Sequence, residues 1–418
     1  MRILLVSQWY DPEPNLKAAP LGGSLAARGH RVTALTGFPN YPHGRIYPGY
    51  RQHLWQVEQR DGVRVVRVPL YPDHSRSVLR RSLHYLSFAT SATVLGSLLC
   101  GPADVAWVYH PPLTAAIPAW WLRWLRGVPF IFEVQDIWPE TLAVTDMLSN
   151  PRLMRWIGAA AQAVYRRAAA ITVISPGFKR HLESLGVPSA KIHVIPNWAD
   201  ETIYRPVPRD PALAAAHGLA GKFNVVYAGN VGPVQALGTV IEAADLLQDL
   251  PEVQFVIIGD GMDRPALESQ VRARGLHNVR FLPHQAAERM PQWLALADVV
   301  LVHLKRDPLC EITIPSKTLA YLACGRPILC AVDGDAAEVV QLAGAGMVCP
   351  PEDPGVLAKA VHDFYRMPSP ARDALGTSGR RAFLANYTRQ VLIDRYEALM
   401  RAVAAQRHRD DRRATQAP

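Results

Sequence analysis

Short apolar runs alternate with longer stretches of helical spacing along most of the chain. In the first half, the runs are Ile3–Ser7, Val32–Thr36, Val63–Val68, Val105–Tyr109, Phe130–Val134 and Ile171–Ile174. In the second half, they are Asn224–Ala228, Gln254–Ile258, Val279–Leu282, Val299–His303 and Ile328–Val332. Strands that alternate with helices form parallel sheets with helices on both faces. The pattern therefore predicts an α/β protein with doubly wound parallel sheets.

The chain length favours two domains rather than one. At 418 residues, each half is long enough to bury its own hydrophobic core. The join is expected in the segment 196–211, which is rich in proline and charge. We therefore predict two Rossmann-like domains, at residues 1–200 and 207–385. If they face a central cleft, the carboxyl ends of both sheets meet there, and open α/β sheets bind ligands at that edge.

Composition and charge narrow the class of protein. Hydrophobic residues make up 49% of the chain and charged residues 19%, and the five cysteines are scattered without disulfide or zinc spacing. This usage favours a reducing, cytoplasmic compartment. The apolar run at the N-terminus is short for a signal peptide, and we interpret it as a buried first strand. The net charge of +9 fits an anionic membrane surface, a diphosphate substrate or merely a basic cytosolic protein, while no nucleic-acid recognition motif is present.

A Ser-Lys pair at the start of a helix is the strongest candidate for chemistry. Ser316 and Lys317 follow the predicted strand Val299–His303 and open a helix that ends at Gly325. Backbone N–H groups, a hydroxyl and a cation at one helix start suit a phosphate or a sugar diphosphate. The alternative interpretation is an ordinary turn with a solvated lysine.

Two glycine-containing turns follow neighbouring strands in the second half. Gly229, Asn230 and Gly232 come between a strand and a predicted helix over Gln235–Leu247, and the triplet 259–261 repeats the arrangement. Glycines let a ligand approach the backbone, and a helix start favours an anion. GxGxxG, the Walker lysine motif, HExxH and GxSxG are all absent from the sequence. It therefore argues against standard nicotinamide, P-loop, zinc-protease and α/β-hydrolase chemistry.

Two segments of the first half suggest a membrane surface. The stretch Leu83–Cys100 holds no charged residue and follows three arginines, and Trp120, Trp121 and Trp124 crowd a later helix together with two more arginines. The arginines are Arg76, Arg80, Arg81, Arg123 and Arg126. Serines and threonines interrupt the uncharged stretch, so we predict a buried or interface-facing helix rather than a spanning one. The alternative is that the tryptophans pack on the sheet.

Several specific segments resemble one known enzyme family. They include SQWYDPEP, TGFPNYPHGRIYPGY, FEVQDIWPETL, VIPNWAD, YAGNVG, IIGDG, VHLKRDPL and IPSKTLAYLACGRPIL. Together they resemble family 4 retaining glycosyltransferases of the GT-B fold, within the branch that builds bacterial O-antigen, capsule and colanic acid and includes L-fucosaminyl transferases.

That resemblance implies transfer from a nucleotide-sugar donor, UDP-linked, to a polyprenyl-diphosphate-linked acceptor. The reaction would take place on the inner face of the cytoplasmic membrane, with the enzyme as a peripheral protein. It implies no metal and no other cofactor. It also implies that residues 386–418 form a helix, Arg389–Ala405, that returns to the first domain, followed by a basic tail.

The chain departs from the wider family at its best-known positions. The usual arginine and lysine are replaced by Asn230 and Gln235, and the paired glutamates fall on Ile312 and Ala320. Glu311 lies one residue from the first of those glutamate positions, and the usual histidine before Asp136 is Gln135.

The remaining residues give the candidate site. For the donor we predict Lys317, which would also act in catalysis, with Ser316, Gly229, Asn230, Gly232, Gln235, Lys305, Arg306 and Glu311. For acceptor activation we predict Asp136 and Glu140, whose alternative role is helix capping. His110 is expected to be exposed to the cleft, although a lone histidine is more often structural. Lys17 could contact acceptor phosphate, with a solvated lysine as the alternative.

Two other classes of function stay open at this point. A sugar-nucleotide epimerase of GT-B architecture would share the diphosphate site, and the missing charged residues would also fit an inactive sugar-nucleotide-binding subunit. Incubation with UDP-sugars, with and without the lipid acceptor, separates the three.

Overall fold

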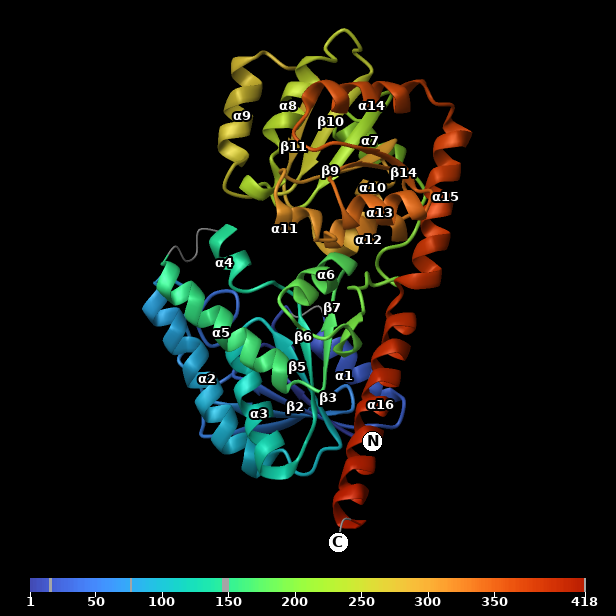
Figure 1. The fold of residues 1–418 in the computed structure, drawn as a ribbon. Helices are drawn as coiled ribbons and strands as arrows, with labels where there is room; N and C mark the ends of the chain where they lie inside the picture. Colours follow the sequence, from blue (N-terminus) through green and yellow to red (C-terminus); the bar gives the residue numbers. More distant parts are fainter. Residues whose placement is uncertain (15–16, 76, 145–149, 417–418) are drawn as a thin grey trace. The chain divides into compact units, whose positions relative to one another are not determined.

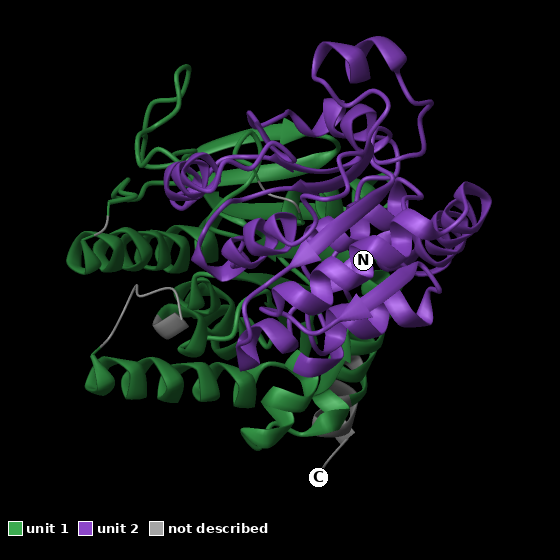
Figure 2. Cartoon of the chain, turned by 90° about the horizontal axis from the view of Figure 1, so that it is seen from above, with its two compact units in different colours: residues 1–174, 178–195, 393–418 green, residues 175–177, 196–392 purple. Residues whose placement is uncertain are grey.

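The computed structural model describes the chain apart from residues 15–16, 76, 145–149 and 417–418 (Figure 1). The chain divides into two compact units, which Figure 2 shows in different colours. The first unit holds residues 1–174, 178–195 and 393–418, and the second holds residues 175–177 and 196–392. The first unit thus contains most of the C-terminal helix as well as the N-terminal half.

The described part of the first unit is built on an eight-stranded sheet in the order β3-β4-β2-β1-β5-β6-β7-β8. All neighbours pair in parallel except β3 and β4, which are antiparallel. The strands are β1 (Arg2–Val6), β2 (Arg31–Gly37), β3 (Gln56–Arg60), β4 (Val63–Val68), β5 (Val105–His110), β6 (Phe130–Val134), β7 (Ala170–Val173) and β8 (Ile192–Val194). The six predicted runs of this half are therefore strands, and β3 and β8 are additional ones at the two edges.

Among the residues that the structure describes, seven helices of the first half and the C-terminus accompany this sheet. They are α1 (Ala18–Ala27), α2 (Val78–Leu99), α3 (Ala116–Arg126), α4 (Glu140–Val144), α5 (Pro151–Arg167), α6 (Pro176–Ser184) and α16 (Arg389–Gln416). Helix α3 packs against both α2 and α5. Helix α16 continues past Ala405, where we expected it to end, to Gln416.

The second unit has a six-stranded, wholly parallel sheet in the order β11-β10-β9-β12-β13-β14. The strands are β9 (Phe223–Ala228), β10 (Val253–Ile258), β11 (Val279–Leu282), β12 (Val299–His303), β13 (Ile328–Ala331) and β14 (Gly346–Cys349). Alternate residues of β9 enter two separate apolar cores, Val226 on one face and Val225 on the other. Burial on both faces explains why these strands read as continuous apolar runs. The predicted doubly wound α/β fold is confirmed.

Helices cover both faces of this second sheet. They are α7 (Pro211–Ala216), α8 (Gly238–Asp245), α9 (Arg264–Ala273), α10 (Met290–Leu294), α11 (Pro308–Glu311), α12 (Ser316–Ala323), α13 (Asp335–Leu342), α14 (Pro354–Arg366) and α15 (Ser369–Asn386). The predicted helix over Gln235–Leu247 is wrong at its start. Residues Pro233–Gln235 form a 3-10 turn, Ala236 is left-handed at φ 46°, and the α-helix begins at Gly238.

Helix α2 is long, but its sequence is broken by serine and threonine. Within the described part of the chain, no helix combines the length and apolarity that a membrane crossing requires. Arg76, one of the arginines expected to precede this helix, lies outside the described residues.

Candidate functional site

The side chain of Lys317 lies over an aromatic ring and has no hydrogen-bond partner. It is the second residue of α12, and its Nζ lies 3.6 Å from the centroid of the Tyr227 ring. Nζ is buried, and no atom of the described chain hydrogen-bonds to it. Burial lowers the pKa of this amine to about 7. A buried cation without a counter-ion is costly unless an anion joins it, so this corner of the second unit suits a negatively charged ligand.

The turn after β9 passes directly over this amine. Gly229 has φ 143°, and a Cβ on it would lie 2.9 Å from Lys317 Nζ. The turn after β10 packs closely against the turn after β9. A Cβ on Gly259 would lie 1.8 Å from the carbonyl oxygen of Gly229. Only glycine permits backbones to approach this closely at such φ values. The two predicted glycine turns therefore form one layered structure, with the lysine beneath it.

Three polar residues surround this turn. Asn230 donates from Nδ2 to Gln235 Oε1 at 3.0 Å, and His303 donates from Nδ1 to the carbonyl oxygen of Gln235 at 2.8 Å. Burial lowers the pKa of His303 despite its bond to that carbonyl, and the charge of Lys317 acts in the same direction. Gly232 is extended at φ −141°, so the turn does not use its glycine freedom. Asn230 and Gln235 are thus in direct contact at this turn.

The other predicted donor residues follow β12, either directly after the strand or on the two helices α11 and α12. Lys305 follows β12 and pairs with Asp307, with 3.2 Å between Nζ and Oδ2. The backbone N–H of Arg306 donates to Glu352 Oε2 at 2.6 Å. Ser316 and Glu311 are exposed, the first at the start of α12 and the second at the end of α11.

Sequence reasoning missed Tyr227, His303 and Glu352 as parts of this corner. Tyr227 and His303 belong to strands that are buried on both faces, so no polar-apolar alternation distinguishes them. Glu352 follows β14 and is left-handed, at φ 54°. The left-handed backbone of Glu352 distinguishes this residue in the structure. That conformation cannot be predicted from the sequence, so sequence reasoning had no signal for Glu352.

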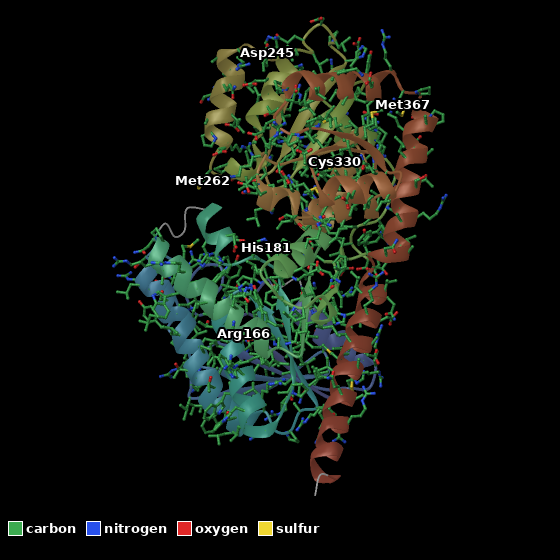
Figure 3. All side chains as sticks on the ribbon, viewed as in Figure 1. Arg166, His181, Asp245, Met262, Cys330 and Met367 are labelled. Atoms are coloured by element: carbon green, nitrogen blue, oxygen red, sulfur yellow. The ribbon has the colours of Figure 1, made fainter. Side chains whose placement is uncertain are left out.

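Two predicted carboxylates lie near the carboxyl end of β6 in the first unit. Asp136 is half-buried, and burial raises the pKa of its carboxyl group. Glu140 opens α4 and forms an ion pair with His181 of α6, with 3.3 Å between Oε1 and Nε2. Figure 3 labels His181. Burial alone would raise the pKa of Glu140, but its hydrogen bond and attraction to His181 lower it overall. Asp136 lies four residues before α4, so it does not occupy the capping position immediately before that helix.

The expectation that His110 is exposed is wrong. It is the last residue of β5, it is fully buried, and its ring packs against Phe132 and Trp138 with centroids 5.5 and 5.1 Å away. Burial lowers the pKa of His110 to about 3. A neutral, enclosed ring of this kind is a packing residue, as the alternative interpretation held.

The alternative interpretation of Lys17 as a solvated lysine is wrong. Its side chain is 2% exposed, and Nζ lies 2.6 Å from Glu133 Oε1 on β6. Tyr396 of α16 donates to Glu133 Oε2 at 2.8 Å, and Thr172 also donates to that oxygen. Burial lowers the pKa of Lys17, although attraction to Glu133 opposes this. The lysine therefore belongs to a buried network that ties α16 to the sheet, and sequence reasoning missed Glu133 and Tyr396.

The described residues hold no group of three or more His, Cys, Asp and Glu side chains placed to bind a metal ion. What the second unit offers instead is a cation beside backbone N–H groups at the carboxyl edge of a parallel sheet, where open α/β folds bind ligands. Two parallel-sheet α/β units, the second with a site suited to a diphosphate, define the GT-B class of glycosyltransferases.

Comparison with known families agrees with this class. Residues 16–198 match the glycosyl transferase 4-like domain, and residues 222–367 match the glycosyl transferases group 1 domain. The two halves of the chain are therefore similar to two glycosyltransferase domains, a 4-like domain followed by a group 1 domain.

Individual relatives include two bacterial glycosyltransferases, one of them assigned by name to colanic acid biosynthesis. The chain is 29% identical over 337 residues to the putative colanic acid biosynthesis glycosyl transferase WcaI of Escherichia coli K12, covering 78% of this chain and 82% of that one. It is 25% identical to the probable glycosyltransferase WbjE of Pseudomonas aeruginosa, covering 68% and 71%.

Solved structures share the fold at lower identity. HepE of Anabaena, crystallised with UDP, has a TM-score of 0.72 and 16% identity, covering 96% of this chain and 100% of that one. WaaG, a glycosyltransferase of lipopolysaccharide biosynthesis, has a TM-score of 0.66 and 16% identity, covering 95% and 99%. These structures establish the two-domain GT-B architecture.

Proposed function

We propose that the protein transfers a sugar from a UDP-linked donor to a lipid-linked glycan acceptor in surface polysaccharide synthesis, with retention at the anomeric carbon. The observation that carries this proposal is the unpaired, buried amine of Lys317 beneath the Gly229 turn. An anion is the one ligand type that removes the cost of that buried charge. The name of WcaI supports a polysaccharide product, and the UDP bound to HepE supports a uridine donor.

In this proposal the second unit stabilises the leaving diphosphate. Lys317 donates to the phosphate oxygens, and the N-terminus of α12 adds its first backbone N–H groups, because no side chain of this fully described unit caps that helix. Negative charge grows on the diphosphate as the glycosidic bond breaks, so donors fixed in advance at this position lower the barrier. No metal is required in this proposal.

The first unit supplies the acceptor side. Asp136 is the candidate to accept the proton of the attacking hydroxyl, since burial raises its pKa toward the range in which a base is effective. The ion pair with His181 lowers the pKa of Glu140 and so favours its charged carboxylate. The second unit binds the donor in this scheme, and the first unit binds the acceptor.

We further propose that the first unit attaches to the membrane as a peripheral protein, on its cytoplasmic face. Helices α2, α3 and α5 expose large apolar side chains next to arginines. Trp124 on α3 and Trp156 on α5 are 71% and 75% exposed. Tryptophan and arginine together suit the headgroup region of a bilayer.

A single incubation series tests this function. The purified protein is mixed with UDP-glucose, UDP-galactose and UDP-N-acetylated hexosamines, with and without a polyprenyl-diphosphate-linked glycan. Acceptor-dependent UDP release with a glycolipid product supports the proposal. Conversion of one UDP-sugar into another without acceptor would show an epimerase, and tight UDP binding with neither reaction would show an inactive binding subunit.

A further inference from the structure

An open apolar groove follows helix α2 in the first unit. Its volume is about 880 Å³. Its apolar walls come from two loop residues and four residues of α2, namely Leu54, Leu70, Leu83, Leu86, Val94 and Leu95. A groove of this size and apolarity is an expected binding place for an elongated hydrocarbon.

The solvent-facing side of α2 carries a stripe of apolar side chains, with Thr90 exposed between Leu86 and Val94. Leu79 and Leu98, near its two ends, are 80% and 76% exposed, and Leu83, Leu86 and Val94 between them are half-exposed or more. These positions are three, four or eight residues apart and therefore share one face of the helix. Exposed apolar stripes of this extent mark a surface that another molecule covers.

Cations gather where α2 begins. His74 lies against the loop that carries His43 and Arg45, because a Cβ on Gly44 would be 2.5 Å from the backbone nitrogen of His74. Partial burial lowers the pKa of His74, the charges of Arg81 and His43 act in the same direction, and Asp73 opposes them. A second hollow, of about 550 Å³, is lined by His43 and Arg45.

One carboxylate, Asp73, lies among these cations. Its Oδ1 accepts hydrogen bonds from the backbone and the hydroxyl of Ser75, and Arg80 helps to lower its pKa. The arginines Arg45, Arg80 and Arg81 outnumber this carboxylate, so the named groups together are net positive. A single positive cluster at one end of an apolar groove matches an anionic headgroup on a hydrocarbon chain.

The two features are aligned with the sheet of the first unit. Strand β4 ends at Val68 and α2 begins at Val78, so the cations lie at the carboxyl edge of the sheet. Asp136 follows β6 at the same edge, because β4 and β6 point in the same direction. The groove leads away from that edge along α2. A ligand with its anionic end at the cations would thus present its headgroup on the side where Asp136 lies.

We propose that this groove holds the isoprenoid chain of a polyprenyl-diphosphate-linked acceptor, with the diphosphate at Arg45, Arg80 and Arg81. This inference rests on the proposed function, since it locates the lipid part of the proposed acceptor. A second copy of the protein would leave the cations without a partner, because α2 itself carries no acidic residue. A flat bilayer surface would not fill a groove.

The probe is geranylgeranyl diphosphate, used below its micelle concentration, and binding is measured by titration calorimetry on the full-length protein. Thr90→Trp fills the groove with a bulky ring, and Leu86→Glu places a charge in its wall. Each is expected to weaken binding at least tenfold. Leu98→Glu is the matched control, since it lies on the same exposed stripe of α2 but outside the groove lining, and it should bind as wild type does.

The chemistry of the ligand is tested with its separate parts. Geranylgeraniol lacks the diphosphate and inorganic diphosphate lacks the chain, so each should bind at least tenfold more weakly than the whole molecule. Arg80→Glu combined with Arg81→Glu should remove the advantage of the diphosphate over the alcohol. Thermal unfolding of every variant confirms that it is folded.

Three results would overturn the inference. One is equal affinity of wild type and Thr90→Trp for the probe. In another, the groove variants lose binding to phosphatidylglycerol vesicles but keep their affinity for the probe. That result would make the groove a bilayer contact. The third is a concentration-dependent dimer that Leu86→Glu dissociates. UDP binding is measured in parallel to separate the groove inference from the proposed function. A protein that binds the probe but not UDP contradicts the proposed function and leaves the groove inference standing.

Discussion

The amine of Lys317 lies 3.6 Å from the centre of the Tyr227 ring, in a place where no atom of the described chain accepts a hydrogen bond from it. The ring face attracts the cation, and this attraction is worth about 1–2 kcal/mol at a desolvated position. That is less than the cost of burying an unpaired charge. The ligand-free protein therefore keeps a destabilising group at this position, as expected of a binding site rather than of a packing residue.

Replacing Lys317 by alanine should lower kcat by about a hundredfold or more, since removing one preorganised donor from a developing negative charge has this effect. The same variant should be at least as stable as wild type without ligand, because it removes a buried unpaired cation. Sugar-transfer assays and thermal unfolding measure the two effects. Lys359→Ala, at an exposed lysine of the same unit, is the control. Wild-type turnover in Lys317→Ala would remove this residue from the mechanism.

The pH dependence of UDP binding follows from the same amine. Burial lowers the pKa of Lys317 to about 7, and a bound diphosphate would raise it again. Above pH 7, binding must therefore take up a proton, and affinity should fall by up to about tenfold per pH unit between pH 7 and 9. In Lys317→Arg the slope should disappear, because a guanidinium stays charged. Calorimetry in buffers of different ionisation enthalpy measures the proton uptake directly, and a flat profile for wild type would contradict the assignment.

The folding linkage of this group has a definite sign. The pKa of Lys317 is lower in the folded state, at about 7, than in the unfolded state, at 10.5. At a pH below 7 the lysine is charged in both states and destabilises the folded protein. This penalty is lost as the pH rises from about 7 toward 10.5. Wild-type stability relative to Lys317→Met should therefore rise by on the order of 1–2 kcal/mol between pH 7 and pH 9. Urea unfolding of both proteins at the two pH values gives the difference.

The sequence predicted most of the fold because burial patterns are local. All eleven predicted apolar runs are strands in the structure, with ends that shift by a residue or two. The missed strands lack that pattern. Residues Gln56–Arg60 are polar at a sheet edge, and Gly346–Cys349 are only half-buried for most of their length. An edge strand needs no continuous apolar run, so periodicity does not detect it.

The candidate site was less predictable because its partners are distant in sequence. Lys317 was found through its place at a helix start, but the ring beneath it is 90 residues away, at Tyr227. Lys17 and Glu133 are separated by 116 residues, so the sequence around Lys17 does not indicate a buried ion pair. His110 was placed wrongly because the end of a strand does not by itself determine whether its side chain meets solvent or a ring.

The buried network around Glu133 should be essential for stability. Glu133→Ala removes the carboxylate that pairs with the buried amine of Lys17, and removing one partner of a buried ion pair costs about 3–5 kcal/mol. Tyr396→Phe removes only one donor to that carboxylate and should cost about 1–3 kcal/mol. The double variant Lys17→Met with Glu133→Leu should recover much of the loss, because both charges are gone. Urea unfolding measures all three, and a Glu133→Ala protein as stable as wild type would show that the pair is not formed.

Replacing Asp136 by asparagine should separate acceptor chemistry from donor binding. The isosteric amide cannot take up a proton, so transfer should fall by at least about a hundredfold. Donor binding should be unchanged, because the diphosphate groups that we propose lie in the other unit. UDP titration and acceptor-dependent turnover measure the two properties. Because burial raises the pKa of Asp136, wild-type kcat/KM should fall at acid pH through a pKa above the usual aspartate range. A full rate in Asp136→Asn would exclude it as the proton acceptor.

Attachment to membranes should depend on the exposed tryptophans of α3 and α5. Trp124 and Trp156 are 71% and 75% exposed, and arginines beside them can meet anionic headgroups with about 1 kcal/mol per basic residue near the surface. Trp124→Ala with Trp156→Ala should therefore weaken flotation with phosphatidylglycerol vesicles several-fold, and high salt should weaken wild type as well. Leu342→Ala removes an equally exposed apolar side chain from the second unit and should change nothing. Vesicle binding that resists both salt and the tryptophan changes would mean that another surface, not α3 and α5, carries the attachment.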